Sequence, residues 1–107
     1  MNALVGSAIM PCGIGDELEP EAAEVVKIIH ASGLPNCTTS MNTEIEGVGD
    51  EVMRVVKDAT FGLASRGIRI EVVLKADVLT GFTNMIQTRV NKVNSIMEGQ
   101  NGHEKKI

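Results

Sequence analysis

The chain has 107 residues and a formal net charge of −4, from 10 Lys and Arg against 14 Asp and Glu. This length allows one domain, and a hydrophobic fraction of 43% is enough for one modest core. The acidic balance, without a long basic run, argues against binding to nucleic acid or to an anionic membrane. Phe61 and Phe82 are the only aromatic residues, so one chain cannot build base-stacking platforms or aromatic cages.

The cysteines and histidines are scattered along the chain. Cys12 and Cys37 belong to no CxxC pair, and no Cys/His cluster has the spacing of a metal site. No signal-peptide pattern opens the chain, and no run reaches 18 apolar residues. We therefore expect a cytoplasmic protein with reduced thiols, with no metal or other cofactor and no membrane partner.

The first half of the chain predicts a strand and a helix. Residues 3–10 are apolar or small on both alternating sets, which is typical of a strand covered on both faces. Pro11 and the following Gly-Ile-Gly turn are expected to end this strand. A helix is predicted at about 19–32, and Gly33 is a natural left-handed terminator. Its apolar stripe has helical spacing and comprises Ala22, Val25, Val26 and Ile29.

The Thr-rich run from Asn36 to Val48 is too long and polar for one strand. We predict a strand to about Ser40, a turn near Met41-Asn42 and a second strand over 43–47, which together make a hairpin. Alternation places Thr43 and Ile45 on one side of the second strand and the glutamates on the other.

The second half predicts a helix, a strand and a helix. Asp50 is a good N-cap for a helix that ends at Gly67. Strict alternation predicts a strand over 68–77, and apolar residues every three or four positions predict a helix at about 82–97. We expect one domain over 1–98 and a frayed tail over 99–107.

This element order is typical of an α+β ferredoxin-like sandwich (βαββαβ) with an additional C-terminal helix. The two helices of that fold cover one sheet face, and the first strand is central. Its second apolar face then needs a cover from the third helix or from another subunit, so we predict a homo-oligomer that packs sheet faces or joins sheet edges. Glu44 and Glu46 fit an apolar face poorly, and we expect them to pair with Arg69 or Lys75 or to lie at a solvated rim. The apolar positions of that face are Leu4, Gly6, Ala8, Met10 and Val73.

The sequence shows no arrangement that predicts catalysis. Cys12 and His30 are the residue types of a nucleophile and its base, but one follows a strand and the other ends a helix, so we interpret them as packing and surface residues. The turn at 13–15 lacks the third glycine of a phosphate-binding loop, because Leu18 stands in its place. We expect a protein that is not an enzyme.

The segment 38–43, Thr-Thr-Ser-Met-Asn-Thr, is the densest set of neutral hydrogen-bonding side chains in the chain. Hydroxyls and amides can recognise the donor and acceptor edge of a heterocycle without charge. Thr also favours strands and Ser-Met-Asn suits a turn, so the residues alone leave a ligand site and a plain hairpin open.

The run 41–47, Met-Asn-Thr-Glu-Ile-Glu-Gly, is similar to the M-[GN]-T-x-[IV]-E-G signature of the small YkoF-like thiamine-binding protein family. Other family features follow in the same order, so the resemblance covers about residues 3–97. They are the strand end Ser7-Ala8-Ile9-Met10-Pro11, Ser32-Gly33-Leu34 after the first helix, the helix start Asp50-Glu51-Val52-Met53 and the strand end Lys75-Ala76-Asp77.

The resemblance implies a ferredoxin-like fold, homo-oligomers that are commonly tetramers, and binding of thiamine or its hydroxymethylpyrimidine part without catalysis. It implies that Thr43 contacts the aminopyrimidine, supplemented by Asn42 and Ser40. The strand end at Ile9 and Met10 lines the same pocket, where Met10 and Met41 supply polarisable contacts in place of aromatics. The chain departs from the family at Asn36, where many members carry an aromatic residue, and at 78–79, where they carry Asp-Arg.

Two other functions remain open at the level of sequence. One is a structural or regulatory homo-oligomer without a small ligand. The other is a small enzyme on this fold, such as an acylphosphatase, although the first strand and its turn lack the arginine-bearing loop that such an enzyme needs. The partners that we expect are a small molecule and the chain itself, as a dimer or tetramer, and no nucleic acid.

Overall fold

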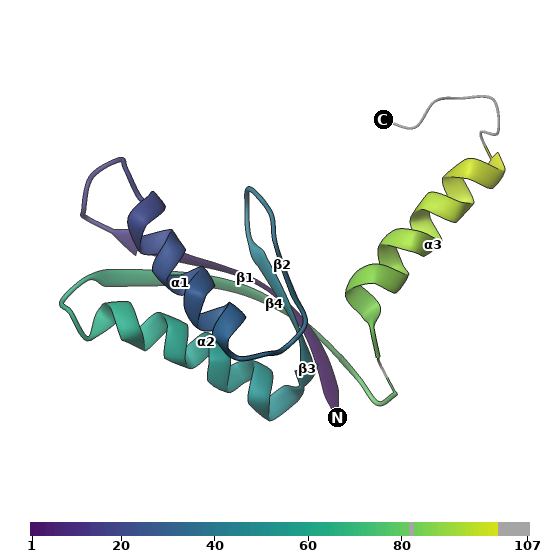
Figure 1. Cartoon of the computed structure of the whole chain (residues 1–107), viewed down its shortest axis with the longest axis horizontal. Coiled ribbons are helices and arrows are strands. Elements are labelled where there is room, and N and C mark those ends of the chain that lie inside the picture. The colour runs from purple at the N-terminus through teal and green to yellow at the C-terminus, as the bar shows by residue number, and fades with distance from the viewer. Residues whose placement is uncertain (82, 101–107) are drawn as a thin grey trace.

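A computed structural model describes residues 1–81 and 83–100 (Figure 1). The chain forms four strands and three helices in the predicted order. They are β1 (Asn2–Cys12), α1 (Glu19–Ala31), β2 (Asn36–Thr38), β3 (Thr43–Val48), α2 (Gly49–Ala64), β4 (Arg69–Leu79) and α3 (Met85–Gln100).

The strands form one sheet in the order β2-β3-β1-β4, and all neighbours are antiparallel. Helices α1 and α2 lie together on one face, whereas α3 projects away from the sandwich (Figure 1). The chain therefore has the α+β ferredoxin-like fold with an additional C-terminal helix, which confirms the predicted fold class. As predicted, β1 occupies a central position.

The core lies between the sheet and its two covering helices. Alternate residues of β1 and β3 point toward the helices, and Val5 and Ile45 are cross-strand partners there. Both are completely buried, as are Ile29 of α1 and Val52 of α2. Removing such side chains from water is the main stabilising contribution to a domain of this size. The helical stripes predicted from the sequence are therefore the surfaces that close the core.

Strand β1 runs beyond its expected end, because Pro11 and Cys12 continue the pairing with β4. Proline lacks an N–H and is tolerated in a strand only where no ladder bond is lost. Beyond Ser7, β1 has no partner on its β3 side, so Pro11 can direct its nitrogen to that open side. The prediction that Pro11 ends the strand was wrong for this reason.

Two helix starts also differ from the prediction. Helix α2 begins at Gly49, so Asp50 lies in the first turn instead of capping the helix. The N–H of Gly49 donates to the carbonyl of Met1, 2.8 Å away. Helix α3 begins at Met85, directly after Asn84, whose φ of 52° is not helical. The predicted start at Phe82 lies outside the described residues.

The second sheet face carries Leu4, Gly6, Ala8 and Met10 of β1 opposite Val73 of β4, as the alternation predicted. We call it the open face. The first turns of α3 approach it, through Glu46 and through an Arg89–Asp77 ion pair. The rest of α3 points away, and the radius of gyration is 16.2 Å, against about 13 Å for a compact domain of this length. The helix continues through Gln100, and residues 101–107 lie outside the described part of the chain.

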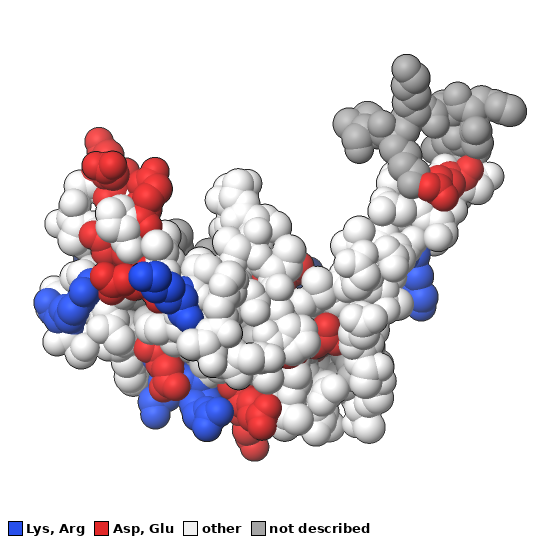
Figure 2. All heavy atoms as spheres, in the orientation of Figure 1, with Lys and Arg blue, Asp and Glu red and all other residues white. Residues whose placement is uncertain are grey.

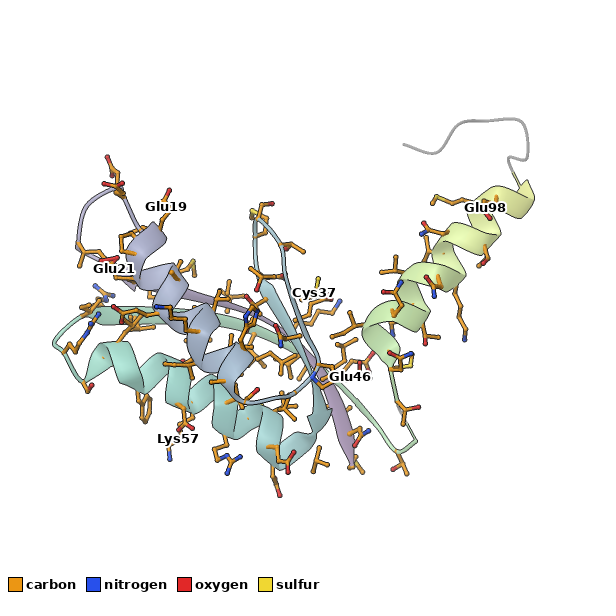
Figure 3. All side chains as sticks on the ribbon, viewed as in Figure 1. Glu19, Glu21, Cys37, Glu46, Lys57 and Glu98 are labelled. Atoms are coloured by element: carbon orange, nitrogen blue, oxygen red, sulfur yellow. The ribbon has the colours of Figure 1, made fainter. Side chains whose placement is uncertain are left out.

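Glu46, a residue of β3, is 3% exposed, and its side chain lies at the start of α3 (Figure 3). Its two carboxylate oxygens accept the backbone N–H groups of Met85 and Ile86, at 2.6 and 3.1 Å. A helix N-terminus leaves such N–H groups without partners inside the helix and favours negative charge. Our expectation for Glu46 was therefore wrong: it neither lies at a solvated rim nor pairs with Arg69 or Lys75, but anchors α3.

Candidate functional site

A cavity of about 160 Å³ opens between α1, the far end of β1 and the β2–β3 hairpin. It exists because β3 begins at Thr43, opposite Ser7, so the pairing of β1 with β3 reaches no further than Ser7. Strand β1 continues for five more residues beside β4. Helix α1 covers this gap from the core side, and the hairpin closes it from the other end. The cavity therefore lies where β3 is shorter than the β1 strand beside it.

The hairpin wall is held in shape by its own turn. The backbone N–H of Thr39 donates to the carbonyl of Asn42 at 2.8 Å. The Thr39 hydroxyl donates to the same carbonyl at 3.2 Å and accepts the N–H of Asn42 at 3.4 Å. Threonine and asparagine side chains stabilise turns in this way, so the turn is fixed before any ligand arrives.

Three hydroxyl groups line the floor of the cavity, those of the buried Ser7 and Thr43 and of the exposed Thr38. The Oγ1 atoms of Thr38 and Thr43 are 3.1 Å apart, and the hydroxyl of Ser7 donates to the carbonyl of Thr43 at 3.1 Å. Ser7 is 2% exposed and Thr43 is 7% exposed. In a hydrogen-bonded hydroxyl pair one hydrogen stays free, together with lone pairs. The threonine pair can therefore either donate to a polar ring or accept from it.

All six residues predicted for the site line this one cavity: Thr43, Asn42, Ser40, Met41, Ile9 and Met10. Their placement differs, however. Thr43 is buried in the floor, whereas Met41 is 83% exposed at the hairpin tip. The amide nitrogen of Asn42 lies 3.5 Å from the position of a Cβ on Gly6, which belongs to the open face. The contacts of these six residues with a ligand remain predictions.

The sequence did not single out the contribution of α1. Four of its residues line the cavity, and they are the apolar stripe that we had assigned to the core: Ala22, Val25, Val26 and Ile29. A stripe that packs on a sheet and a stripe that borders a cavity have the same periodicity. Whether the α1 stripe packs on the sheet or borders a cavity depends on how far β3 extends. No residue pattern within α1 indicates this.

None of the described residues that line the cavity carries an ionisable side chain. Acidic side chains gather instead over the loop before α1 and its first turns, and the tip of the hairpin, residues 38–43, is uncharged (Figure 2). Among residues 1–81 and 83–100, no three His, Cys, Asp or Glu side chains lie close enough to hold a metal ion. Such a cavity can bind a neutral group by hydrogen bonds and apolar contact.

The remaining candidate residues lie elsewhere. Cys12 and Cys37 are both free cysteines, the first half-buried and the second exposed on β2 (Figure 3). The Cys12 sulfur lies 3.6 Å from the carbonyl of Met10. His30 is exposed in the last turn of α1. None of the described helices is long and apolar enough to cross a membrane.

Fold and cavity together describe a small ferredoxin-like protein with an uncharged cavity at the end of its β2–β3 hairpin. Comparison with known proteins gives the family: residues 5–94 match the model of the family described as thiamine-binding protein. UPF0045 proteins of Mycobacterium bovis and Mycobacterium tuberculosis are 36% identical over 94 residues, which is 87% of this chain and 92% of each relative. The chain belongs to the thiamine-binding protein family, as its sequence motifs suggested.

Solved structures agree on the fold. A protein of Methanocaldococcus jannascii is similar with a TM-score of 0.79 and 22% identity, over 87% of this chain and 96% of its own. A Thermotoga maritima protein, provisionally assigned to thiamine biosynthesis or salvage, has a TM-score of 0.72 and 20% identity, over 85% of this chain and 99% of its own.

Proposed function

We propose that the chain binds thiamine, or its hydroxymethylpyrimidine part, in the cytoplasm and without catalysing a reaction. The observation that carries this proposal is the uncharged cavity beside Thr43, which combines the paired hydroxyls of Thr38 and Thr43 with apolar walls. Membership of a thiamine-binding family supports the same ligand class.

The size of the cavity favours the pyrimidine as the enclosed part. A space of roughly 150 Å³ holds one benzene ring, and sites for drug-sized molecules are about 300–1,000 Å³. The cavity here measures about 160 Å³. One substituted six-membered ring fills it, so the cationic thiazolium of thiamine stays outside, where the acidic surface of the protein tolerates a positive charge.

We further propose that the protein acts as a homo-oligomer, a dimer or a tetramer. Four apolar residues of α3 are between 41% and 57% exposed: Val90, Val93, Ile96 and Met97. On the open face, Val73 is also exposed. Apolar surface of this extent indicates an interaction site. The same observation favours the second candidate function, a structural homo-oligomer without a ligand.

Calorimetry with thiamine and with hydroxymethylpyrimidine tests the ligand. We expect saturable heat and a raised melting temperature for both compounds, because a ligand that binds only the folded state stabilises it. Absence of both effects at millimolar ligand contradicts the binding function and leaves the structural oligomer.

Two neighbouring alanines provide a matched pair of variants. Ala22 and Ala23 are both exposed on α1, but only Ala22 lines the cavity. We expect Ala22→Leu to fill part of the space and to weaken binding at least tenfold, because a ring cannot share the volume of the added side chain. Ala23→Leu should bind like the wild type. Equal binding by both variants would place the ligand elsewhere.

A further inference from the structure

The end of β1 offers an unfilled position in the sheet at the wall of the cavity. Pairing of β1 with β3 stops at Ser7–Thr43, whereas pairing with β4 continues to Cys12–Arg69. One edge of β1 is therefore open beyond Ser7. Three residues of this stretch, Ala8, Ile9 and Met10, line the cavity.

The hydrogen bonds of the hairpin determine which main-chain groups point into this opening. The N–H of Thr39 donates to the carbonyl of Asn42, and the N–H of Glu46 donates to the carbonyl of Pro35. The even-numbered residues of the segment 42–48, which includes β3, therefore direct their main-chain groups toward β2. Because successive residues of a strand point these groups to opposite sides, the odd-numbered residues direct theirs toward β1.

The same alternation carries over to β1. Thr43 pairs with Ser7 in the register, so the odd-numbered residues of β1 face the β3 side and the even-numbered residues face β4. Beyond Ser7, the odd-numbered residues are Ile9 and Pro11. This direction agrees with the position of Pro11, whose nitrogen has no hydrogen to donate to β4.

Ile9 is thus the residue that presents both a donor and an acceptor to the opening. In an extended strand the N–H and the C=O of one residue point the same way, side by side. Within the described residues, Ile9 has one strand partner, Val72 of β4, on the opposite side. Its side chain packs against the core, so its main chain is held in place. Pro11, the next residue on this edge, offers only a carbonyl.

We propose that the main-chain N–H and C=O of Ile9 recognise the amidine edge of the aminopyrimidine. The N–H donates to the ring nitrogen, and the carbonyl accepts from the neighbouring amino group, as the next residue of β3 would do if the strand continued. This inference rests on the proposed function and specifies the ligand class: flat heterocycles with a ring-nitrogen acceptor beside an N–H donor.

The ligand side of this contact is tested by removing the donor. The 4-deamino analogue of hydroxymethylpyrimidine keeps the ring, the methyl group and the hydroxymethyl group but cannot donate to the carbonyl of Ile9. We expect it to bind about tenfold more weakly than hydroxymethylpyrimidine in calorimetry, which corresponds to one neutral hydrogen bond. Equal affinity of the two compounds would overturn the proposal.

The protein side is tested by a backbone ester. Cys12 allows a synthetic segment 1–11 to be ligated to segment 12–107, with the α-hydroxy acid analogue of isoleucine at position 9. This change removes the N–H and keeps the side chain. The Ile9 N–H makes no ladder bond, but the carbonyl of Ala8, which faces β4, becomes an ester and accepts more weakly. We therefore expect only a small decrease in melting temperature and about tenfold weaker binding of hydroxymethylpyrimidine. The ligated protein with all amides is the control, and an ester protein with the affinity of the control would refute the assignment.

Amide hydrogen exchange gives an independent reading on the unmodified protein. Without ligand, the Ile9 amide should exchange faster than those of Ala8 and Met10, which face β4, and hydroxymethylpyrimidine should slow it at least tenfold. Heat of binding without protection of Ile9 overturns this inference and leaves the proposed function intact. Absence of any heat overturns both.

Discussion

Thr43 joins the floor of the cavity to the sheet. Its hydroxyl lies 3.1 Å from that of Thr38, and its carbonyl accepts the Ser7 hydroxyl. Removal of the Thr43 hydroxyl therefore changes the polar floor while leaving the backbone pairing in place. We expect Thr43→Val to weaken binding of hydroxymethylpyrimidine about tenfold in calorimetry, and to lower stability by about 1 kcal/mol, the typical net contribution of one hydrogen bond.

The matched control for this substitution is Thr60→Val. Thr60 lies in α2, where its hydroxyl donates to the carbonyl of Val56 at 2.8 Å, outside the cavity. This variant also loses one hydroxyl hydrogen bond, but its ligand affinity should stay that of the wild type. If both variants bind alike, the Thr43 hydroxyl has no part in recognition.

The sequence predicted the residues of the polar wall of the cavity, on the hairpin, better than those of its apolar wall, on α1. Thr43, Asn42 and Ser40 drew attention because hydroxyls and amides gathered in one short segment. Ala22 of α1 carries no comparable signal, since an apolar helix residue fits a core equally well. The role of Ile9 lies in its main chain, which every residue except proline shares, so it follows only from the strand register.

Helix α3 is the element whose attachment is most unusual. It is anchored to the sheet by the Glu46 carboxylate and by the Arg89–Asp77 ion pair, while its apolar side chains stay exposed. We expect Glu46→Gln to lower the free energy of unfolding by about 1–3 kcal/mol, because an amide accepts with one atom and lacks the charge that the helix N-terminus favours. Urea denaturation measures this loss, and amide exchange at Met85 and Ile86 should become faster.

Glu44→Gln is the control for that substitution. Glu44 lies two residues earlier on the same strand and face, and among the described residues the N–H groups at the start of α3 donate to Glu46 and not to Glu44. It should unfold like the wild type. Unchanged exchange at Met85 in the Glu46 variant would mean that α3 is held by other contacts.

Periodicity was sufficient to predict each element, but not where the elements meet. The strict alternation over 68–77 and the apolar stripes gave the order of strands and helices, and this order gave the fold. The extension of β1 through Pro11 depends on which side of the strand is unpaired, and the burial of Glu46 depends on the path of the chain after β4. Both are tertiary facts that a local pattern does not contain.

Among the described residues, two surfaces expose apolar side chains: the open face, where Met10 and Val73 are 37% and 63% exposed, and the stripe of α3. Because α3 points away from its own sheet (Figure 1), it cannot cover that face within one chain. A second copy can offer each surface to the other reciprocally, as the two-fold symmetry of common homodimers requires. The unusual extension of the monomer, with principal dimensions of 53 × 34 × 20 Å, is then a property of one chain taken out of its assembly.

We expect a mass in solution of two or four times the 11.4 kDa of one chain, measurable by analytical ultracentrifugation. Val93 is 56% exposed at the centre of the α3 stripe, and Val93→Glu should shift the protein to monomers, because a buried unpaired carboxylate costs several kcal/mol per site. Met53→Glu is the control, since Met53 is similarly exposed but lies on α2. A monomeric wild type, or a Val93 variant that keeps the full mass, would contradict assembly through α3.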